Sequence, residues 1–357
     1  MCAQRRAGSR TFQQPSLDAT PPRDGTGTRA GRWRSLGRRQ LARLQDHAEF
    51  RLFDSLPSGR ASEVRSADGT RIHVEVFGPE HGYPIVLSHG VCCGIRFWSH
   101  QIADLSENYR VIAFDHRGHG LSARPARAAH TIQRLGDDLA AVLRSTLHSG
   151  ERALLAGHSM GGITIQAWAD QYPADVARFA DATALINTSP GELAEGLTTP
   201  PAGSRMPESM TALMTSLSGL MIETFGGTPV PVRLPLRSAL LSPLAIGSTA
   251  TPAARALIQE LILTTPATTR GHFIRTLAAL RTEQLDHSRL TAPTLVIGST
   301  DDRLLPMSHS IRLESLLPNP LGVQELPGGH CGPVEQPTVI TAALHQLAQK
   351  ARESTSA

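Results

Sequence analysis

The stretch Gly157-His158-Ser159-Met160-Gly161 decides the fold of this chain. It follows a short apolar run, residues 153–156, and leads into residues of helical character from 163 to 169. A serine between two glycines at a strand-to-helix turn is the nucleophile-elbow pattern. The glycines are needed because the strand and helix backbones nearly touch, and the N–H groups at the start of the helix would face a developing oxyanion. We therefore predict that Ser159 is a nucleophile.

A serine nucleophile needs a base to take its proton and an acid to orient that base. Gly328-Gly329-His330 follows the last predicted strand, so His330 is the candidate base. The acid should follow the preceding strand, where Asp301 and Asp302 are adjacent. The spacing to Pro306 favours Asp302, whereas counting three residues on from Gly298 favours Asp301. We take Asp302 as the first candidate and keep Asp301 as the alternative acid.

Two backbone N–H donors must be in place before the oxyanion forms. We expect one from Met160, directly after the serine, and one from Val91, in the loop that begins His89-Gly90. We interpret His89 as a residue that fixes this loop. Residues 115–122 contain an aspartate and two histidines, but their spacing suits a tight loop in which Arg117 binds carboxylates and carbonyls. No zinc-type spacing of cysteine or histidine occurs, so we expect no metal and no cofactor.

Short apolar runs alternate with helical stretches along most of the chain. A hairpin across Asp68-Gly69 joins two predicted strands, and the later runs are residues 84–88, 110–115, 152–157, 183–187, 293–298 and 323–326. Continuous apolar strands that alternate with helices predict a parallel sheet covered on both faces. The alternation breaks after residue 190, and a structureless loop of that length is unusual in a compact domain. We predict a tail at 1–45, a core at 46–189 and 289–352, and a helical insertion at 190–288.

Together, these motifs resemble the α/β-hydrolase superfamily over about residues 60–350. They point to its esterase/lipase and cofactor-free haloperoxidase-like branch. The resemblance implies an α/β fold in which a mostly parallel sheet of eight strands carries helices on both faces and an inserted helical cap. It implies a triad of Ser159, Asp302 and His330. Relatives with an aspartate nucleophile are set aside because Ser159 holds that position.

The sequence departs from the family pattern in two places. The acid loop has one extra residue, which leaves Asp301 and Asp302 in competition. The loop His89-Gly90-Val91-Cys92-Cys93 lacks the signature of monoacylglycerol lipases, so that particular assignment does not follow.

The three cysteines at 92, 93 and 331 lie on loops that this fold would bring near the site, where we expect them to pack as small residues; a thiol that controls access is the alternative.

The insertion bears on the substrate. Methionines and leucines recur at helical spacing between residues 206 and 222, and methionine adapts to varied apolar shapes. The insertion shows no arginine cluster placed to hold a phosphate or a carboxylate. We therefore expect a small, lipophilic, neutral ester as substrate.

The charge is divided unevenly along the 357 residues, whose formal net charge is +4. Residues 1–45 hold ten arginines and two aspartates, whereas the remainder holds 25 basic and 29 acidic residues. A mildly acidic body is unsuited to binding nucleic acid, which requires basic side chains clustered over the folded face. No apolar run is long enough to span a bilayer and no secretory signal is present, so we expect a cytoplasmic protein, with weak contact between the basic tail and anionic membranes as a further hypothesis.

Three hypotheses follow for the function. The first is a serine esterase or lipase that cleaves carboxylic esters through an acyl-enzyme. The second keeps the same triad but uses hydrogen peroxide as the acyl acceptor, as a perhydrolase or cofactor-free haloperoxidase. The third is a ligand-binding protein of this fold without catalytic activity.

Overall fold

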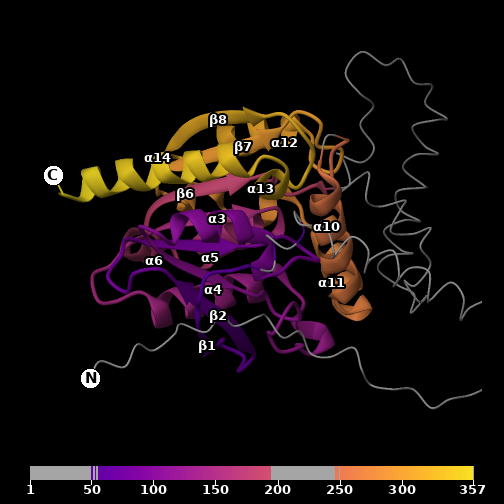
Figure 1. Cartoon of the computed structure of the whole chain (residues 1–357), viewed down its shortest axis with the longest axis horizontal. Coiled ribbons are helices and arrows are strands. Elements are labelled where there is room, and N and C mark those ends of the chain that lie inside the picture. Colours follow the sequence, from indigo (N-terminus) through magenta and orange to yellow (C-terminus); the bar gives the residue numbers. More distant parts are fainter. Residues whose placement is uncertain (1–49, 51–52, 54, 194–245, 249, 357) are drawn as a thin grey trace, which may run out of the picture.

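An eight-stranded sheet forms the centre of the molecule (Figure 1). The computed structural model describes residues 50, 53, 55–193, 246–248 and 250–356. The strand order is β1-β2-β4-β3-β5-β6-β7-β8. The pairs β1–β2 and β2–β4 are antiparallel and all other neighbours are parallel, so the sheet is mostly parallel as predicted.

The strands agree closely with the apolar runs of the sequence. They are β1 (Arg60–Arg65), β2 (Arg71–Phe77), β3 (Pro84–Ser88), β4 (Arg110–Phe114), β5 (Ala153–His158), β6 (Ala180–Ile186), β7 (Thr294–Ser299) and β8 (Pro320–Leu326). The turn between β1 and β2 is built by Asp68, whose carboxylate accepts the Thr70 N–H at 3.0 Å, and by Gly69 at a φ of 82°. Strands β6 and β7 pair although the insertion separates them in sequence, so both parts of the core share one sheet.

Helices cover both faces of the sheet. They are α3 (Ser99–Leu105), α4 (Ile132–Thr146), α5 (Met160–Gln171), α6 (Pro173–Phe179), α12 (Met307–Leu316), α13 (Gly332–Glu335) and α14 (Pro337–Ser356), with short 3-10 turns η2 (Ile95–Trp98) and η3 (Arg127–Ala129). The sequence reading missed α6 and α12, which are seven and ten residues long. Helices α13 and α14 are separate, since Pro337 lacks the N–H that a continuous helix would need.

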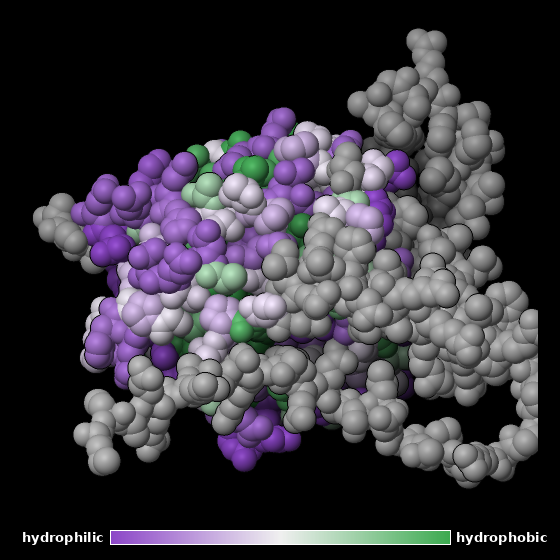
Figure 2. All heavy atoms as spheres, viewed as in Figure 1, coloured by the Kyte–Doolittle hydropathy of each residue, from purple (hydrophilic) through white to green (hydrophobic). Residues whose placement is uncertain are grey.

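The surface is mainly hydrophilic on the face shown in Figure 2, where hydrophobic residues form separate patches. Large apolar side chains with substantial exposure are Leu121, Leu263, Ile311, Leu316, Leu321 and Val339. Single exposed apolar residues of this kind are normal for a folded protein. Among the helices of the described ranges, none combines the length and apolar character that crossing a membrane requires.

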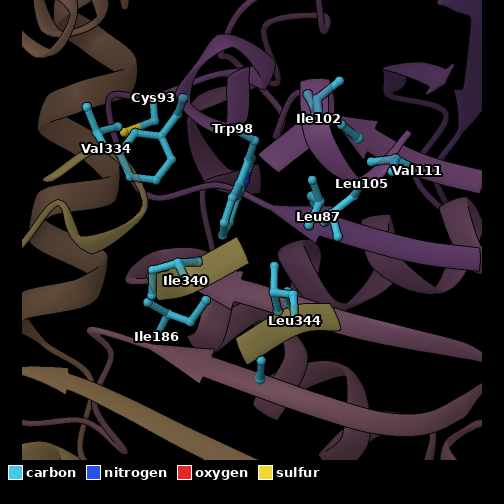
Figure 3. Packing of buried hydrophobic residues seen from close by; sticks show 14 of the residues in the cluster. Leu87, Cys93, Trp98, Ile102, Leu105, Val111, Ile186, Val334, Ile340 and Leu344 are labelled. Carbon is cyan, nitrogen blue, oxygen red and sulfur yellow. The ribbon is translucent and has the colours of Figure 1, made fainter. Parts of the chain in front are cut away.

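Two apolar layers lie on opposite sides of the sheet. On one side α3 and α14 pack against the strands, and Figure 3 shows Trp98 facing Ile340 and Leu344 of α14. On the other side α4, α5 and α12 bury their apolar faces against the sheet. Each Å² of apolar surface that is buried stabilises the fold by about 25 cal/mol, so these layers are the main source of stability. They also fix the loops at the strand ends.

Two helices of the insertion fall within the described residues, α10 (Pro252–Thr264) and α11 (Ala267–Ala278). A buried ion pair, Arg96 Nη1 to Glu260 Oε1 at 2.9 Å, joins α10 to the turn η2 after β3. Phe273 and Leu277 of α11 pack with Ile163 of α5. The methionine-rich stretch 206–222 and the basic tail 1–45 lie outside the described residues.

Candidate active site

Ser159 lies in a sharp turn between β5 and α5. Its φ of 52° and ψ of −119° are rare for a residue other than glycine. A Cβ on Gly157 would approach the Gly161 carbonyl oxygen to 2.5 Å, and one on Gly161 would approach the Ser88 carbonyl oxygen to 2.1 Å. The glycines of the elbow are therefore required by backbone contacts, as the sequence pattern predicts.

A hydrogen-bonded line connects Ser159, His330 and Asp302. The Ser159 Oγ lies 3.0 Å from His330 Nε2, and His330 Nδ1 lies 2.8 Å from Asp302 Oδ2. All three residues are buried, and they come from the loops after β5, β8 and β7. The structure thus brings together the serine, the histidine and the first-choice acid of the sequence analysis.

The two adjacent aspartates have different environments. Asp302 Oδ1 accepts the N–H groups of Leu304 at 2.9 Å and Leu305 at 2.8 Å, which leaves Oδ2 to face His330. Asn187 Nδ2 donates to the same Oδ2 at 3.2 Å. Asp301 is exposed, and its backbone N–H donates to the Gly328 carbonyl at 3.0 Å. Only Asp302 is therefore placed to orient the imidazole.

Glu335 holds the loop that carries His330, a role that the sequence reading missed. Its Oε2 accepts the N–H of Gly329 at 2.8 Å and its Oε1 accepts the N–H of Cys331 at 3.0 Å, so both neighbours of His330 are fixed. The same Oε2 accepts the N–H of Gly247, a residue of the insertion, at 3.0 Å. The signal in the sequence was an acidic residue five positions after the histidine.

His158 fixes the His330 loop from the other side. Its Nε2 donates to the His330 carbonyl at 2.8 Å, and its ring stacks on Phe97 with centroids 4.5 Å apart. Complete burial, with His330 nearby, lowers the pKa of His158 well below its usual value. His158 is therefore neutral, which suits a hydrogen-bond donor to a carbonyl.

The two candidate oxyanion donors lie beside Ser159. Met160 is the first residue of α5, so its N–H belongs to the group that a helix leaves without an intrahelical acceptor. Val91 follows Gly90, where a Cβ would come within 3.2 Å of the Ser159 Cβ. The loop after β3 thus approaches the serine closely enough for its backbone to face the reacting atoms.

His89 and His119 fix the loop that carries Val91. His89 Nδ1 donates to the Gly90 carbonyl at 2.7 Å, while its Nε2 accepts the His116 N–H at 3.0 Å. His119 Nε2 accepts the Cys92 N–H at 3.1 Å. Burial lowers the pKa of His89 well below its usual value and that of His119 to about 4. Both imidazoles are therefore neutral acceptors, and His89 has the loop-fixing geometry expected from the sequence.

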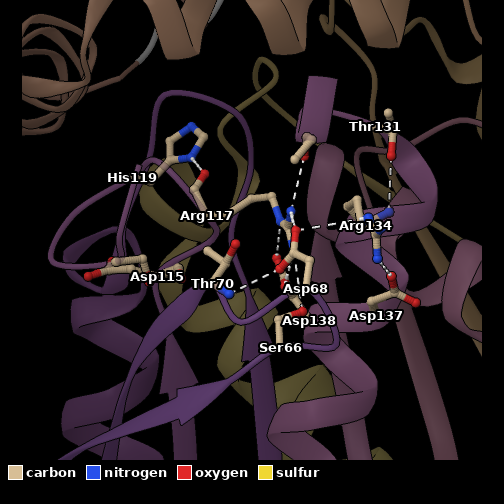
Figure 4. A network of polar contacts seen from close by, with 12 residues as sticks. Ser66, Asp68, Thr70, Asp115, Arg117, His119, Thr131, Arg134, Asp137 and Asp138 are labelled. Atoms are coloured by element: carbon tan, nitrogen blue, oxygen red, sulfur yellow. Dashed lines mark hydrogen bonds and ion pairs between the residues drawn. The ribbon is translucent and has the colours of Figure 1, made fainter. Parts of the chain in front are cut away.

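Arg117 organises the loop after β4, as Figure 4 shows. Its guanidinium binds Asp138 through two hydrogen bonds of 2.7 and 2.6 Å and also contacts Asp68 at 2.8 Å. It further donates to the Ala129 carbonyl at 3.1 Å. The side chain is fully buried, so these bonds compensate its desolvation. Within the described ranges, no group of three metal-binding side chains is found.

Cys92, Cys93 and Cys331 are buried and form no disulfide. Burial raises the pKa of Cys92 to about 12 and that of the other two well above the usual thiol value. Since the thiolate is the reactive form, these thiols are poorly reactive. Figure 3 shows Cys93 against Val334, in the packing environment of a small apolar residue.

The fold and this geometry agree with the comparison with known families. The sequence profile described as alpha/beta hydrolase fold matches residues 83–337. The chain belongs to the α/β-hydrolase family. The resemblance stated from the motifs and the predicted fold class are thereby confirmed.

Individual relatives carry several activities. A non-heme chloroperoxidase from Streptomyces lividans is 32% identical over 163 residues, covering 45% of this chain and 51% of that protein, about half its length. A 2-(acetamidomethylene)succinate hydrolase from Mesorhizobium japonicum is 27% identical over 268 residues, covering 71% of this chain and 93% of that protein. Among solved structures, an esterase from Rhodococcus sp. ECU1013 is 25% identical with a TM-score of 0.64, covering 81% of this chain and 98% of that one.

Proposed function

We propose that this α/β-hydrolase is a serine hydrolase that cleaves carboxylic esters through an acyl-enzyme. The observation that carries the proposal is the line of hydrogen bonds from Ser159 through His330 to Asp302. The same arrangement of nucleophile, base and orienting acid recurs in serine hydrolases of unrelated folds, which indicates that the arrangement itself supports the reaction. The similarity to an esterase of 25% identity over most of both chains supports the same reaction class.

In the proposed mechanism Ser159 Oγ attacks the ester carbonyl carbon while His330 Nε2 takes the hydroxyl proton. The N–H groups of Val91 and Met160 stabilise the tetrahedral oxyanion. When the intermediate collapses, His330 returns the proton to the leaving alcohol and the acyl group remains on Ser159. His330 then removes a proton from water, which attacks the acyl-enzyme and releases the acid. Asp302 keeps the His330 Nδ1–H oriented and stabilises the imidazolium.

For the substrate we propose a small lipophilic ester. The support is the methionine-rich sequence 206–222, in which the adaptable side chains suit varied apolar groups. An acyl-chain series from acetate to laurate measures this preference directly. Higher kcat/KM for the longer chains supports the lipophilic substrate, and a steep decline beyond acetate contradicts it.

The test of the mechanism is turnover of p-nitrophenyl esters by wild type, Ser159→Ala and Ser145→Ala. Ser145 is an exposed serine on α4 and serves as the matched control. Triad residues act as a unit, so Ser159→Ala should lower kcat by several orders of magnitude, whereas Ser145→Ala should change it less than twofold. Full activity of Ser159→Ala would exclude the mechanism. Absence of both turnover and fluorophosphonate labelling in wild type would favour a ligand-binding protein.

A second candidate uses the same residues with hydrogen peroxide in place of water as acyl acceptor. It is favoured by the similarity to a non-heme chloroperoxidase, which is limited to about half of that protein. A peroxide-dependent halogenation assay with an added carboxylic acid separates the two. Peroxide-dependent product that disappears in Ser159→Ala supports the perhydrolase, and ester hydrolysis alone supports the first proposal.

A further inference from the structure

A surface pocket of about 410 Å³ lies where the loop before α4 meets helix α11 of the insertion. Its polar lining consists of Arg127, His130, Thr131, His272, Arg275 and Thr276. It shares no lining residue with the triad. Arg127 belongs to the core and Arg275 to the insertion, so the two arginines are far apart in sequence. The sequence of the insertion alone therefore shows no arginine cluster.

The pocket lining concentrates positive charge without a carboxylate. Two guanidinium groups and two imidazoles converge, with the His130 and His272 ring centroids 4.8 Å apart. Arg275 Nη2 donates at 2.8 Å to His272 Nδ1, an imidazole nitrogen rather than an acid. Burial lowers the pKa of His272, and the nearby His130, Arg275 and Arg127 lower it further. Two guanidinium groups that line one pocket without a carboxylate among its lining residues favour an anion between them.

Donor groups are available for such an anion. Because His272 Nδ1 accepts from Arg275, its proton is on Nε2, which is therefore a donor. Arg127 is exposed and presents a guanidinium that suits an oxyanion in two-point contact. Helix α4 begins after Thr131 with no acidic residue in its first turn, so the positive end of its dipole adds to the pocket.

We propose that this pocket binds a phosphate dianion, either free or as the monoester group of an organic ligand. The arginines supply planar forks of donors that match phosphate oxygens, and the Nε2–H of His272 supplies a further donor. The Nδ1–H of His130 donates to the Arg127 carbonyl at 3.2 Å, so His130 becomes a donor to the anion when its Nε2 gains a proton. The ligand would bridge the core, through Arg127 and His130, to the insertion, through His272 and Arg275. A bound phosphate would therefore hold α11 against the core.

Isothermal titration with inorganic phosphate and with phenyl phosphate tests the proposal on wild type, Arg127→Gln, Arg275→Gln and Arg124→Gln. Arg124 is an exposed arginine near the pocket in sequence but outside its lining, so it controls for the loss of one charge. Each pocket variant should weaken binding about tenfold, as expected for one lost charge-assisted hydrogen bond, and Arg124→Gln less than twofold. Far-UV circular dichroism melts establish that all variants are folded.

The two probes distinguish the source of the phosphate group. Binding of inorganic phosphate with equal or greater affinity assigns the site to the free ion, and a preference for phenyl phosphate assigns it to a monoester. Failure of wild type to bind either probe at millimolar concentration would overturn the proposal. Equal weakening by Arg124→Gln, or binding of acetate as tight as that of phosphate, would overturn it as well. None of these outcomes depends on ester hydrolysis.

Discussion

Ser159 adopts a backbone conformation that costs on the order of 1–3 kcal/mol, and the surrounding structure holds it there. Its N–H donates to the Ile186 carbonyl at 3.0 Å, and its own carbonyl accepts the Thr188 hydroxyl at 2.8 Å and the Gly162 N–H at 2.9 Å. Ser159 is thus held in this conformation by groups at the end of β6 and just after it, and by the first turn of α5. In this position the Ser159 hydroxyl lies 3.0 Å from His330 Nε2.

At the same scale, the two aspartates give opposite predictions. Asp302→Asn keeps the side-chain shape but removes the charge that orients the imidazole, so kcat should fall by about 10⁴-fold. Asp301→Asn, at an exposed neighbour that does not contact His330, should leave kcat within twofold. Steady-state kinetics on one p-nitrophenyl ester compare the two variants. If Asp301→Asn were the more damaged enzyme, the assignment of Asp302 as the acid would fail.

Among the elements, the short segment between β8 and α14 decides how well the base is placed. His330 has no regular secondary structure of its own, yet its carbonyl is held by His158 and both flanking N–H groups by Glu335. Gly247 is required next to this carboxylate, because a Cβ there would approach Glu335 Oε2 to 2.5 Å. The loop is therefore positioned by groups from β5 and α13 and by Gly247 of the insertion.

Glu335→Gln tests this positioning role. An amide can accept at one end only, so its NH₂ group would oppose the N–H of Gly329 or of Cys331 and displace the loop. A displacement near 1 Å costs about 10²-fold in rate, so kcat should fall by about 10- to 100-fold with KM within twofold. Glu325→Gln, an exposed carboxylate on β8, is the control and should be unaffected. A rise in KM with unchanged kcat would contradict a role in placing His330.

The whole molecule shows which features can be predicted from sequence. The strands were found because parallel strands buried on both faces form continuous apolar runs, and the elbow because its glycines are fixed by local contacts. The spacing to Pro306 favoured Asp302 but left Asp301 as an alternative, since the choice depends on two loop N–H groups that orient the Asp302 carboxylate. The role of Glu335 was also hidden, because one of its partners, Gly247, lies 88 residues away in sequence.

The same molecular core holds four fully buried histidines, and their burial makes stability depend on pH. Burial lowers the folded-state pKa of each below the value near 6.5 expected when unfolded: His89, His116, His119 and His158. The unfolded chain therefore binds more protons than the folded one below pH 6.5. By linkage the free energy of unfolding therefore decreases as the pH is lowered through that range. Burial raises the pKa of Asp115 and Asp138, which opposes this trend, but the histidines outnumber them.

We predict that stability changes little between about pH 7 and 8 and falls steadily as the pH is lowered from 6.5 to 4. For His119, whose folded pKa is about 4, the loss reaches about 3 kcal/mol at the lower end of this range. Urea unfolding at pH 8, 7, 6 and 5 measures the slope. His119→Gln keeps an oxygen that can accept the Cys92 N–H and removes one proton from the linkage, so its slope should be shallower. His81→Gln changes an exposed histidine and should reproduce the wild-type slope. A wild-type slope of zero below pH 6.5 would mean that the four buried histidines are not held neutral by the fold.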